Sequence, residues 1–117
     1  MTLFGINGVR GTANRDLTPD VALQIGKAVG MTYGRRIAVA TDSRDSADML
    51  RSAVSAGMMA VGTDVVDLGM LPTPALQHYV ATHQEVTGGI MITASHNPAD
   101  HNGFKFIGGD GVEIDRT

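Results

Sequence analysis

The densest group of chemically active side chains lies between Ser95 and Lys105. A serine that accepts and returns a phosphoryl group needs an exposed hydroxyl, a neighbouring group that moves its proton, and cations or N–H donors around the phosphate oxygens. Ser95, His96 and Lys105 offer these functions, which favours phosphoryl transfer with Ser95 as nucleophile. The stretch holds a hydroxyl, two imidazoles, two amides and an ammonium group, from Ser95, His96, Asn97, His101, Asn102 and Lys105.

Two other interpretations of this stretch remain open. In the first, Ser95 caps a turn, both histidines are solvated and Asn97 starts a bend at the following proline. In the second, His96, Asp100 and His101 bind a metal ion. Three ligands so close together in a loop that contains proline do not easily surround one ion, and no fourth ligand is evident. Neither interpretation needs a nucleophile at Ser95.

The glycine-rich segment 4–11 is a second candidate, because its glycines surround the single Arg10. Glycines let the main chain turn tightly, and the planar guanidinium suits a phosphate group. The alternative is a flexible entry segment with a solvated arginine. The spacing is not the GxGxxG dinucleotide pattern, and no GxxxxGK[ST] loop occurs in the chain. Nucleotide binding of these two kinds therefore lacks support.

Helices and strands alternate in the predicted secondary structure. Thr18 and Pro19 open a helix that Gly34 closes, and Asp45 or Ser46 caps the next helix. Such alternation implies right-handed crossovers and a mostly parallel sheet with helices on both faces. We therefore predict the α/β class, with three layers in the order α/β/α. The predicted helices cover 18–34, 45–62 and a segment from 73, and the predicted strands cover 36–42, 64–68 and 86–92.

The glycine-rich turn 108–111 separates two short apolar runs, 104–107 and 112–114. This pattern predicts an antiparallel hairpin at the edge of the sheet. In open α/β sheets, ligands bind beyond the carboxyl ends of the strands. Three polar loops are expected there, at 42–44, 69–73 and 94–102, and the last is the richest in functional groups.

Composition excludes several classes of partner. The 117 residues, 43% of them hydrophobic, suffice for one domain. The net charge of −3 is spread along the chain, so we expect neither nucleic acid nor a membrane surface as partner. No stretch approaches the roughly 18 apolar residues of a membrane span, and the absence of cysteine fits a cytoplasmic protein.

Three motifs together resemble the α-D-phosphohexomutase superfamily. The residues 93–98, TASHNP, and 102–105, NGFK, are similar to its signature TASHNP…NGxK. The opening FGINGVRG resembles the family's FGTxGxRG, and the DSR at 42–44 lies where the family has DxR. Two positions depart from the pattern, Ile6 where threonine is frequent and Ala40 where glycine is common.

The resemblance implies a phosphoglucomutase, phosphomannomutase or phosphoglucosamine mutase. In these enzymes the serine that matches Ser95 carries a phosphoryl group, gives it to a sugar monophosphate, and regains one from the other end of the bisphosphorylated intermediate. His96 and Lys105 become candidates for proton transfer and phosphate stabilisation. The phosphate on Ser95 would supply one ligand to Mg²⁺. The resemblance also places Arg10, which would contact the phosphate, among the catalytic residues. Phosphate or substrate binding is implied for Arg10, Asn97, Asn102 and Lys105.

The resemblance also implies that residues 1–117 form domain I of a four-domain protein, cut short before its end, with domains II–IV absent. The remaining magnesium ligands and the sugar-recognition loop are expected in those domains. We therefore expect the chain alone to be inactive and its uncovered surface to favour self-association. The competing hypothesis is a non-catalytic phosphate-binding or interaction module. A phosphatase that used Ser95 would need a metal cluster of its own, which the sequence does not show.

Overall fold

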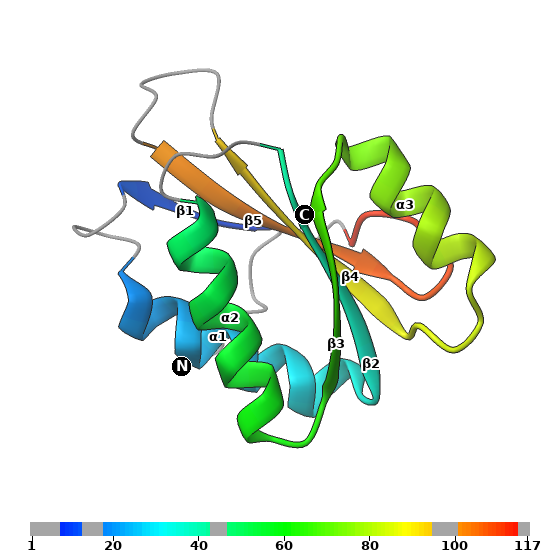
Figure 1. Ribbon diagram of the computed structural model, residues 1–117, viewed down its shortest axis with the longest axis horizontal. Helices are drawn as coiled ribbons and strands as arrows, with labels where there is room; N and C mark the ends of the chain where they lie inside the picture. Colours follow the sequence, from blue (N-terminus) through cyan, green and yellow to red (C-terminus); the bar gives the residue numbers. More distant parts are fainter. Residues whose placement is uncertain (1–7, 13–17, 43–46, 95–100, 115–117) are drawn as a thin grey trace.

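The computed structural model describes residues 8–12, 18–42, 47–94 and 101–114. Helices and strands alternate along most of these residues, as Figure 1 shows. The strands are β1 (Gly8–Thr12), β2 (Arg36–Thr41), β3 (Asp64–Met70), β4 (Gly88–Ala94) and β5 (His101–Gly108). The helices are α1 (Pro19–Tyr33), α2 (Ala47–Ala60) and α3 (Thr73–Thr82). Among the described residues, no helix has the length and apolar character that crossing a bilayer requires.

The strands form one sheet in the order β1-β5-β4-β2-β3. Strand β2 runs parallel to both β3 and β4, whereas β5 runs antiparallel to both β4 and β1. Strand β1 therefore runs in the same direction as β2, β3 and β4. The carboxyl ends of these four strands meet at one edge of the sheet, which we call the carboxyl edge.

Short-range interactions set the ends of α1. The Thr18 hydroxyl accepts a hydrogen bond from the Val21 amide at 3.2 Å, and Pro19 occupies the first turn. At the other end Gly34 has φ of 99°, a conformation that favours glycine, and its N–H donates to the Gly30 carbonyl at 3.1 Å. Both predicted boundaries of this helix are confirmed. The predicted cap of α2 at Asp45 or Ser46 lies outside the described residues.

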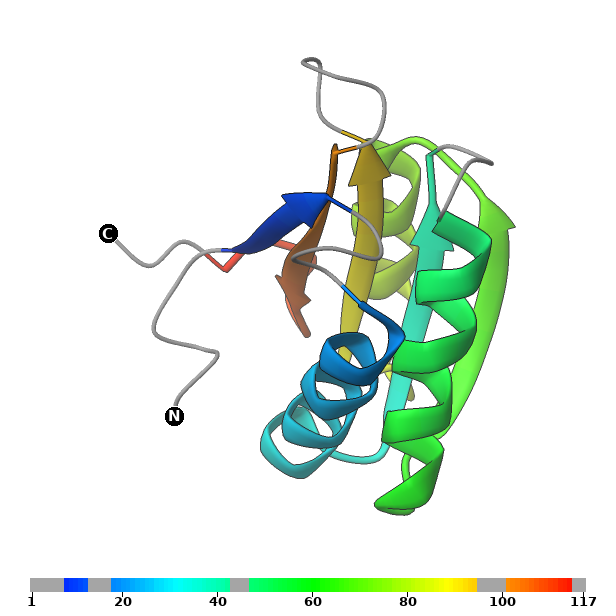
Figure 2. The same ribbon diagram turned by 90° about the vertical axis from the view of Figure 1, so that its left-hand side faces the viewer.

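Two apolar layers hold the helices to the sheet. Alternate residues of a strand face opposite sides, so each central strand contributes to both layers. Helices α1 and α2 cover one face and α3 covers the other, as Figure 2 shows. This arrangement confirms the predicted three-layer α/β/α fold. The first layer joins Ile25, Val29, Leu50, Val54 and Met58 to Ile37, Val39, Ile90, Ile92, Phe104 and Phe106. The second joins Leu76 and Val80 to Ala38, Ala40, Met91 and Ile107.

Strand β1 differs from the prediction of a tightly turning segment at 4–11. Residues 8–12 are extended and pair with residues 101–105 of β5. Without β1, the backbone N–H and C=O groups on that side of β5 would be unpaired. Pairing with β1 satisfies the backbone groups of both strands. The predicted hairpin is present beyond this pairing, because Glu113 bridges Ile107 and the Ile114 N–H donates to the Phe106 carbonyl at 2.7 Å.

The pair Gly88–Gly89 lies at the start of β4. A Cβ atom at Gly89 would lie 3.0 Å from Cγ2 of Val80 in α3, and one at Gly88 would lie 3.1 Å from the carbonyl oxygen of Ile107. These glycines therefore permit close packing of β4 against α3 and β5.

Candidate active site

Backbone hydrogen bonds hold the ends of three strands together at the carboxyl edge. The Asp42 N–H, directly after β2, donates to the Ile92 carbonyl of β4 at 3.1 Å. The Leu71 N–H, directly after β3, donates to the Thr41 carbonyl of β2 at 2.8 Å. The segments after β2, β3 and β4 therefore all leave the sheet at this edge, although β3 continues to Met70 and β4 to Ala94, beyond the predicted loop starts at 69 and 94.

Candidate residues from distant parts of the sequence occupy adjacent strands at the same corner. Arg10 in β1 pairs with Gly103 in β5, and Gly103 pairs in turn with Thr93 in β4. Asn102 lies opposite Ala94, the last residue of β4. The candidate nucleophile is the next residue along the chain. The sheet thus brings the backbone positions of the opening motif, the TASHNP motif and the NGFK motif together.

Lys105 lies slightly deeper in the sheet, opposite Met91 of β4. Its neighbours Phe104 and Phe106 belong to the core under α1 and α2, and Ile107 belongs to the core under α3. Alternation along β5 therefore places the half-buried Lys105 side chain on the α3 face. Its register partner Met91 lies three residues before Ala94, the last residue of β4.

Three of the predicted site residues, Ser95, His96 and Asn97, lie outside the described residues. The same holds for Ser43 and Arg44 of the DSR motif. Asp100, a member of the alternative metal site, also lies outside. The structure therefore gives the frame around the site, and the roles of these side chains remain predictions from the sequence.

An irregularity at the end of β3 was not predicted. The register between β2 and β3 shifts after Val39, so that Val39 pairs with Asp67 and the next residue pairs with Gly69. Gly69 has φ of 73°, and its N–H donates to Oδ1 of Asp67 at 2.9 Å. This bulge changes the side on which the last residues of β3 point. The available signal was the Asp-x-Gly pattern, in which the aspartate bonds the backbone two residues on.

Arg51 connects this bulge to α2. Its Nε lies 3.6 Å from Oδ2 of Asp67, and its Nη2 lies 3.2 Å from Oδ1 of Asp48 in the first turn of the helix. The Asp67 carboxylate therefore binds both the bulge and the arginine. This network fixes the first turns of α2 relative to the carboxyl end of β3.

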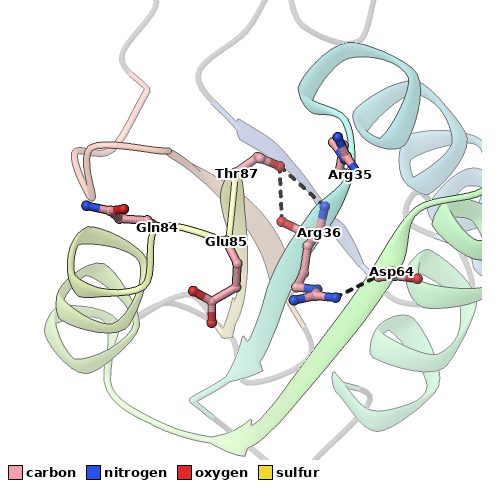
Figure 3. A pocket seen from close by; sticks show the side chains of 6 residues that line it. All are labelled: Arg35, Arg36, Asp64, Gln84, Glu85 and Thr87. Atoms are coloured by element: carbon pink, nitrogen blue, oxygen red, sulfur yellow. Dashed lines mark hydrogen bonds and ion pairs between the residues drawn. The ribbon is translucent and has the colours of Figure 1, made fainter.

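A hollow of about 320 Å³ lies at the opposite end of the sheet (Figure 3). Arg36, Asp64 and Thr87 line it at the starts of β2, β3 and β4, and Arg36 is bonded to Asp64 at 3.4 Å. A strand of seven residues spans roughly 20 Å, so this hollow is remote from the carboxyl edge. The positive charges of its two arginines are balanced by the negative charges of Asp64 and Glu85. The hollow therefore has no excess positive charge that would favour a phosphate group.

The carboxylates and histidines of the described residues do not gather into a metal site. No group of three or more His, Cys, Asp or Glu residues there is placed to hold a metal ion. Asp67 is occupied by Arg51 and Gly69. The described residues therefore do not form a magnesium site on their own.

Comparison with known families identifies the fold. Residues 1–117 match the family model described as phosphoglucomutase/phosphomannomutase, alpha/beta/alpha domain I. The chain belongs to the phosphoglucomutase/phosphomannomutase family. The resemblance drawn from the three sequence motifs is thereby confirmed, although the roles of individual residues are not tested by it.

Individual members of the phosphoglucomutase/phosphomannomutase family support the assignment. The chain is 49% identical over 116 residues to a phosphoglucosamine/phosphogalactosamine mutase of Sulfurisphaera tokodaii, covering 97% of this chain and 25% of that protein. It is 44% identical over 118 residues to a phosphoglucosamine mutase of Alkaliphilus oremlandii, covering 96% and 26%. The chain thus spans about a quarter of the length of these relatives.

Solved structures of the family share the architecture. A putative phosphomannomutase from Thermus thermophilus superposes with a TM-score of 0.84 at 35% identity, covering 95% of this chain and 26% of that one. A phosphoglucomutase/phosphomannomutase family protein from Burkholderia thailandensis gives 0.82 at 35% identity, covering 96% and 27%. The α/β fold described above is therefore that of the family.

Proposed function

We propose that this chain is the phosphoserine domain of a phosphohexose mutase, an intramolecular phosphotransferase that interconverts hexose or hexosamine 1-phosphate and 6-phosphate. One observation carries the proposal. The register from Arg10 through Gly103 to Thr93 joins three motifs at the carboxyl edge, although about 80 residues separate the first from the others. Ligand sites of open α/β sheets lie at that edge. The family membership supports the same conclusion.

The proposed reaction transfers one phosphoryl group in each direction. The bond between phosphorus and Oγ of Ser95 breaks, and a bond forms between phosphorus and a hydroxyl oxygen of the sugar monophosphate. The proton of that hydroxyl is delivered to the serine oxygen, with His96 or Lys105 as its carrier. The phosphoryl group at the other end of the bisphosphorylated sugar then returns to Ser95, and the proton moves back.

Other side chains of the proposed site bind phosphate. Arg10 supplies a bidentate donor, while Asn97 and Asn102 supply amide donors. Lys105 would offset negative charge on the transferring group from the α3 face. Catalysis of phosphoryl transfer depends mainly on such positioning and electrostatic stabilisation.

The proposal includes a Mg²⁺ ion, to which the phosphate on Ser95 would supply one ligand. When bound, the ion would offset negative charge on the transferring phosphoryl group. The remaining ligands are proposed to lie in the further domains that the resemblance implies. No step of the reaction is derived through the ion.

The proposal concerns the full-length mutase, in which this chain is joined to the remaining domains that the resemblance implies. The chain covers about a quarter of its relatives, and we propose that it is inactive alone. We assign the enzyme to the cytoplasm and its substrate to the phosphosugars, with neither nucleic acid nor membrane as partner. We further propose that the isolated chain self-associates through the surface that the other domains would cover.

The intact mass of the full-length protein, purified from cells, tests the proposal. We expect an excess of about 80 Da, one phosphoryl group, that disappears on incubation with excess sugar monophosphate. Ser95→Ala should lack the excess, while Ser52→Ala, at an exposed position in α2, should keep it. If no excess is found, and none forms with glucose or mannose 1,6-bisphosphate and magnesium, the non-catalytic module becomes the better account.

A further inference from the structure

Gly103 is a glycine inside β5 whose backbone conformation does not require glycine. A glycine within a strand commonly supplies a positive φ, forms a bulge, or lets a ligand or another part of the chain approach closely. Gly103 is not among the described glycines with a positive φ. Its register with Arg10 in β1 and with Thr93 in β4 is continuous, so it forms no bulge. Close approach of another group is therefore the explanation that remains.

The neighbours of Lys105 indicate which group approaches. Gly103 and Ile107, two residues before and after Lys105, share the α3 face with it. Ile107 and the register partner Met91 are both fully buried in the core under α3, so they close two sides of the Lys105 position. Glycines form the other two sides, Gly8 across in β1 and Gly103 along β5. Of these two, only Gly103 lies between Lys105 and the carboxyl edge.

The charge and the length of the lysine side chain fit this opening. The Lys105 side chain forms no hydrogen bond or ion pair with another described residue. Two residues of a strand span about 7 Å, so Gly103 lies about that much nearer to the carboxyl edge, level with Thr93. A half-buried lysine keeps its flexible four-carbon stem on the protein surface and its charged end in water. The stem can run toward the edge only if no side chain projects from position 103.

We propose that Gly103 is a positioning residue of the phosphoryl-transfer site: because it has no side chain, the Lys105 stem lies across it and carries the ammonium group to the carboxyl edge. This inference rests on the proposed function, in which Lys105 serves the transferring group. Gly103 is buried, so a methyl group added there displaces a neighbour instead of entering solvent. A lysine stem is flexible, and its displacement moves the charge at little cost in stability.

Substitutions at Gly103 in the full-length protein test the proposal. Gly103→Ala and Gly103→Val add side chains of increasing size. Gly108→Ala is the control, because Gly108 ends the same strand and a Cβ atom there would lie 3.2 Å from Oδ1 of the exposed Asp110, which can move aside. The readouts are the thermal-unfolding midpoint and kcat with glucosamine, glucose and mannose 1-phosphate in turn.

A second set of variants separates positioning of the lysine from a merely structural role. Gly103→Ala is combined with Lys105→Met, whose residual turnover is measured at high enzyme concentration. A structural effect of the methyl group persists when the lysine is absent, whereas an effect that acts through the lysine disappears.

We expect Gly103→Ala to keep the unfolding midpoint within about 2 °C of wild type. Its kcat should fall at least about tenfold, because a misplacement of about 1 Å can cost 100-fold in rate. Gly103→Val should lower kcat further, and Gly108→Ala should keep the wild-type value. In the Lys105→Met background, Gly103→Ala should change kcat less than about twofold.

Three results would overturn the inference: wild-type kcat for Gly103→Ala, the same loss of kcat with and without Lys105, or a larger fall in the unfolding midpoint. If the wild-type protein isomerises none of the three sugar phosphates, the proposed function fails and this inference fails with it. A wild-type protein that turns over, beside a Gly103→Ala variant that turns over equally fast, would overturn this inference alone.

Discussion

Helices α1 and α2 pack so closely that two of their glycines leave no room for a methyl group. A Cβ atom at Gly26 would lie 2.1 Å from the carbonyl oxygen of Val54, and one at Gly57 would lie 2.1 Å from the carbonyl oxygen of Leu23. Both obstacles are backbone atoms, so no side-chain rotation relieves the overlap. Alanine at either position must therefore push the helices apart.

The size of the effect follows from this geometry. Close C–H···O contacts place carbon and oxygen about 3.3 to 3.6 Å apart, so the 2.1 Å approach at Gly26 must lengthen by about 1.2 Å. That movement loosens the core around Ile25 and Val54. Overpacking costs about 1–3 kcal/mol, and a rigid backbone obstacle favours the upper end. Alanine regains about 1 kcal/mol of helix propensity over glycine. We expect Gly26→Ala to lower the free energy of unfolding by about 2 kcal/mol.

Urea unfolding of the 117-residue chain, followed by far-ultraviolet circular dichroism, measures this loss. Ser52→Ala, at an exposed position of α2, is the control and should change the free energy of unfolding by no more than about 0.5 kcal/mol. The double variant with Gly57→Ala should lose less than the sum of the single variants, because the first substitution has already separated the helices. Equal or greater stability of Gly26→Ala would refute the reasoning.

Two further predictions concern charged side chains. Arg51→Gln, which removes the ion pairs to Asp48 and Asp67, should lower the free energy of unfolding by about 0.5 kcal/mol. The loss should shrink in 1 M salt, and an identical loss at low and high salt would contradict the ion-pair explanation. For the full-length protein, the proposed function predicts that Lys105→Met reduces kcat at least about 100-fold, and wild-type turnover would remove Lys105 from the proposed mechanism. Lys105→Arg separates its two proposed roles, because arginine keeps the charge but does not release a proton: retained activity assigns Lys105 to phosphate stabilisation, and lost activity assigns it to proton transfer.

Sequence alone predicted the elements whose boundaries depend on adjacent residues. The start of α1 follows from a threonine cap before Pro19, and its end follows from Gly34, which adopts a positive φ. The TASHNP motif was expected at the end of a strand, and β4 does end at Ala94. Such signals lie within a few neighbouring residues of the sequence, so no tertiary information is needed to interpret them.

The missed features depend on partners far away in the sequence. Strand β1 contains Gly8 and Gly11, and glycine has low strand propensity. Its extended form is stabilised by pairing with β5, about 90 residues later. The ion pair between Asp67 and Arg51 likewise joins two separate elements.

A single-turnover transfer experiment tests most directly the central claim that Ser95 passes its phosphoryl group to a sugar. Full-length protein labelled with ³²P at Ser95 is mixed with unlabelled glucosamine, glucose or mannose 6-phosphate in separate reactions. The account predicts that, with at least one of these sugars, the label lost from the protein appears in a sugar bisphosphate in equal amount, and that Ser95→Ala takes up no label. Label that stays on the protein with all three sugars, or leaves it only as inorganic phosphate, would contradict the account.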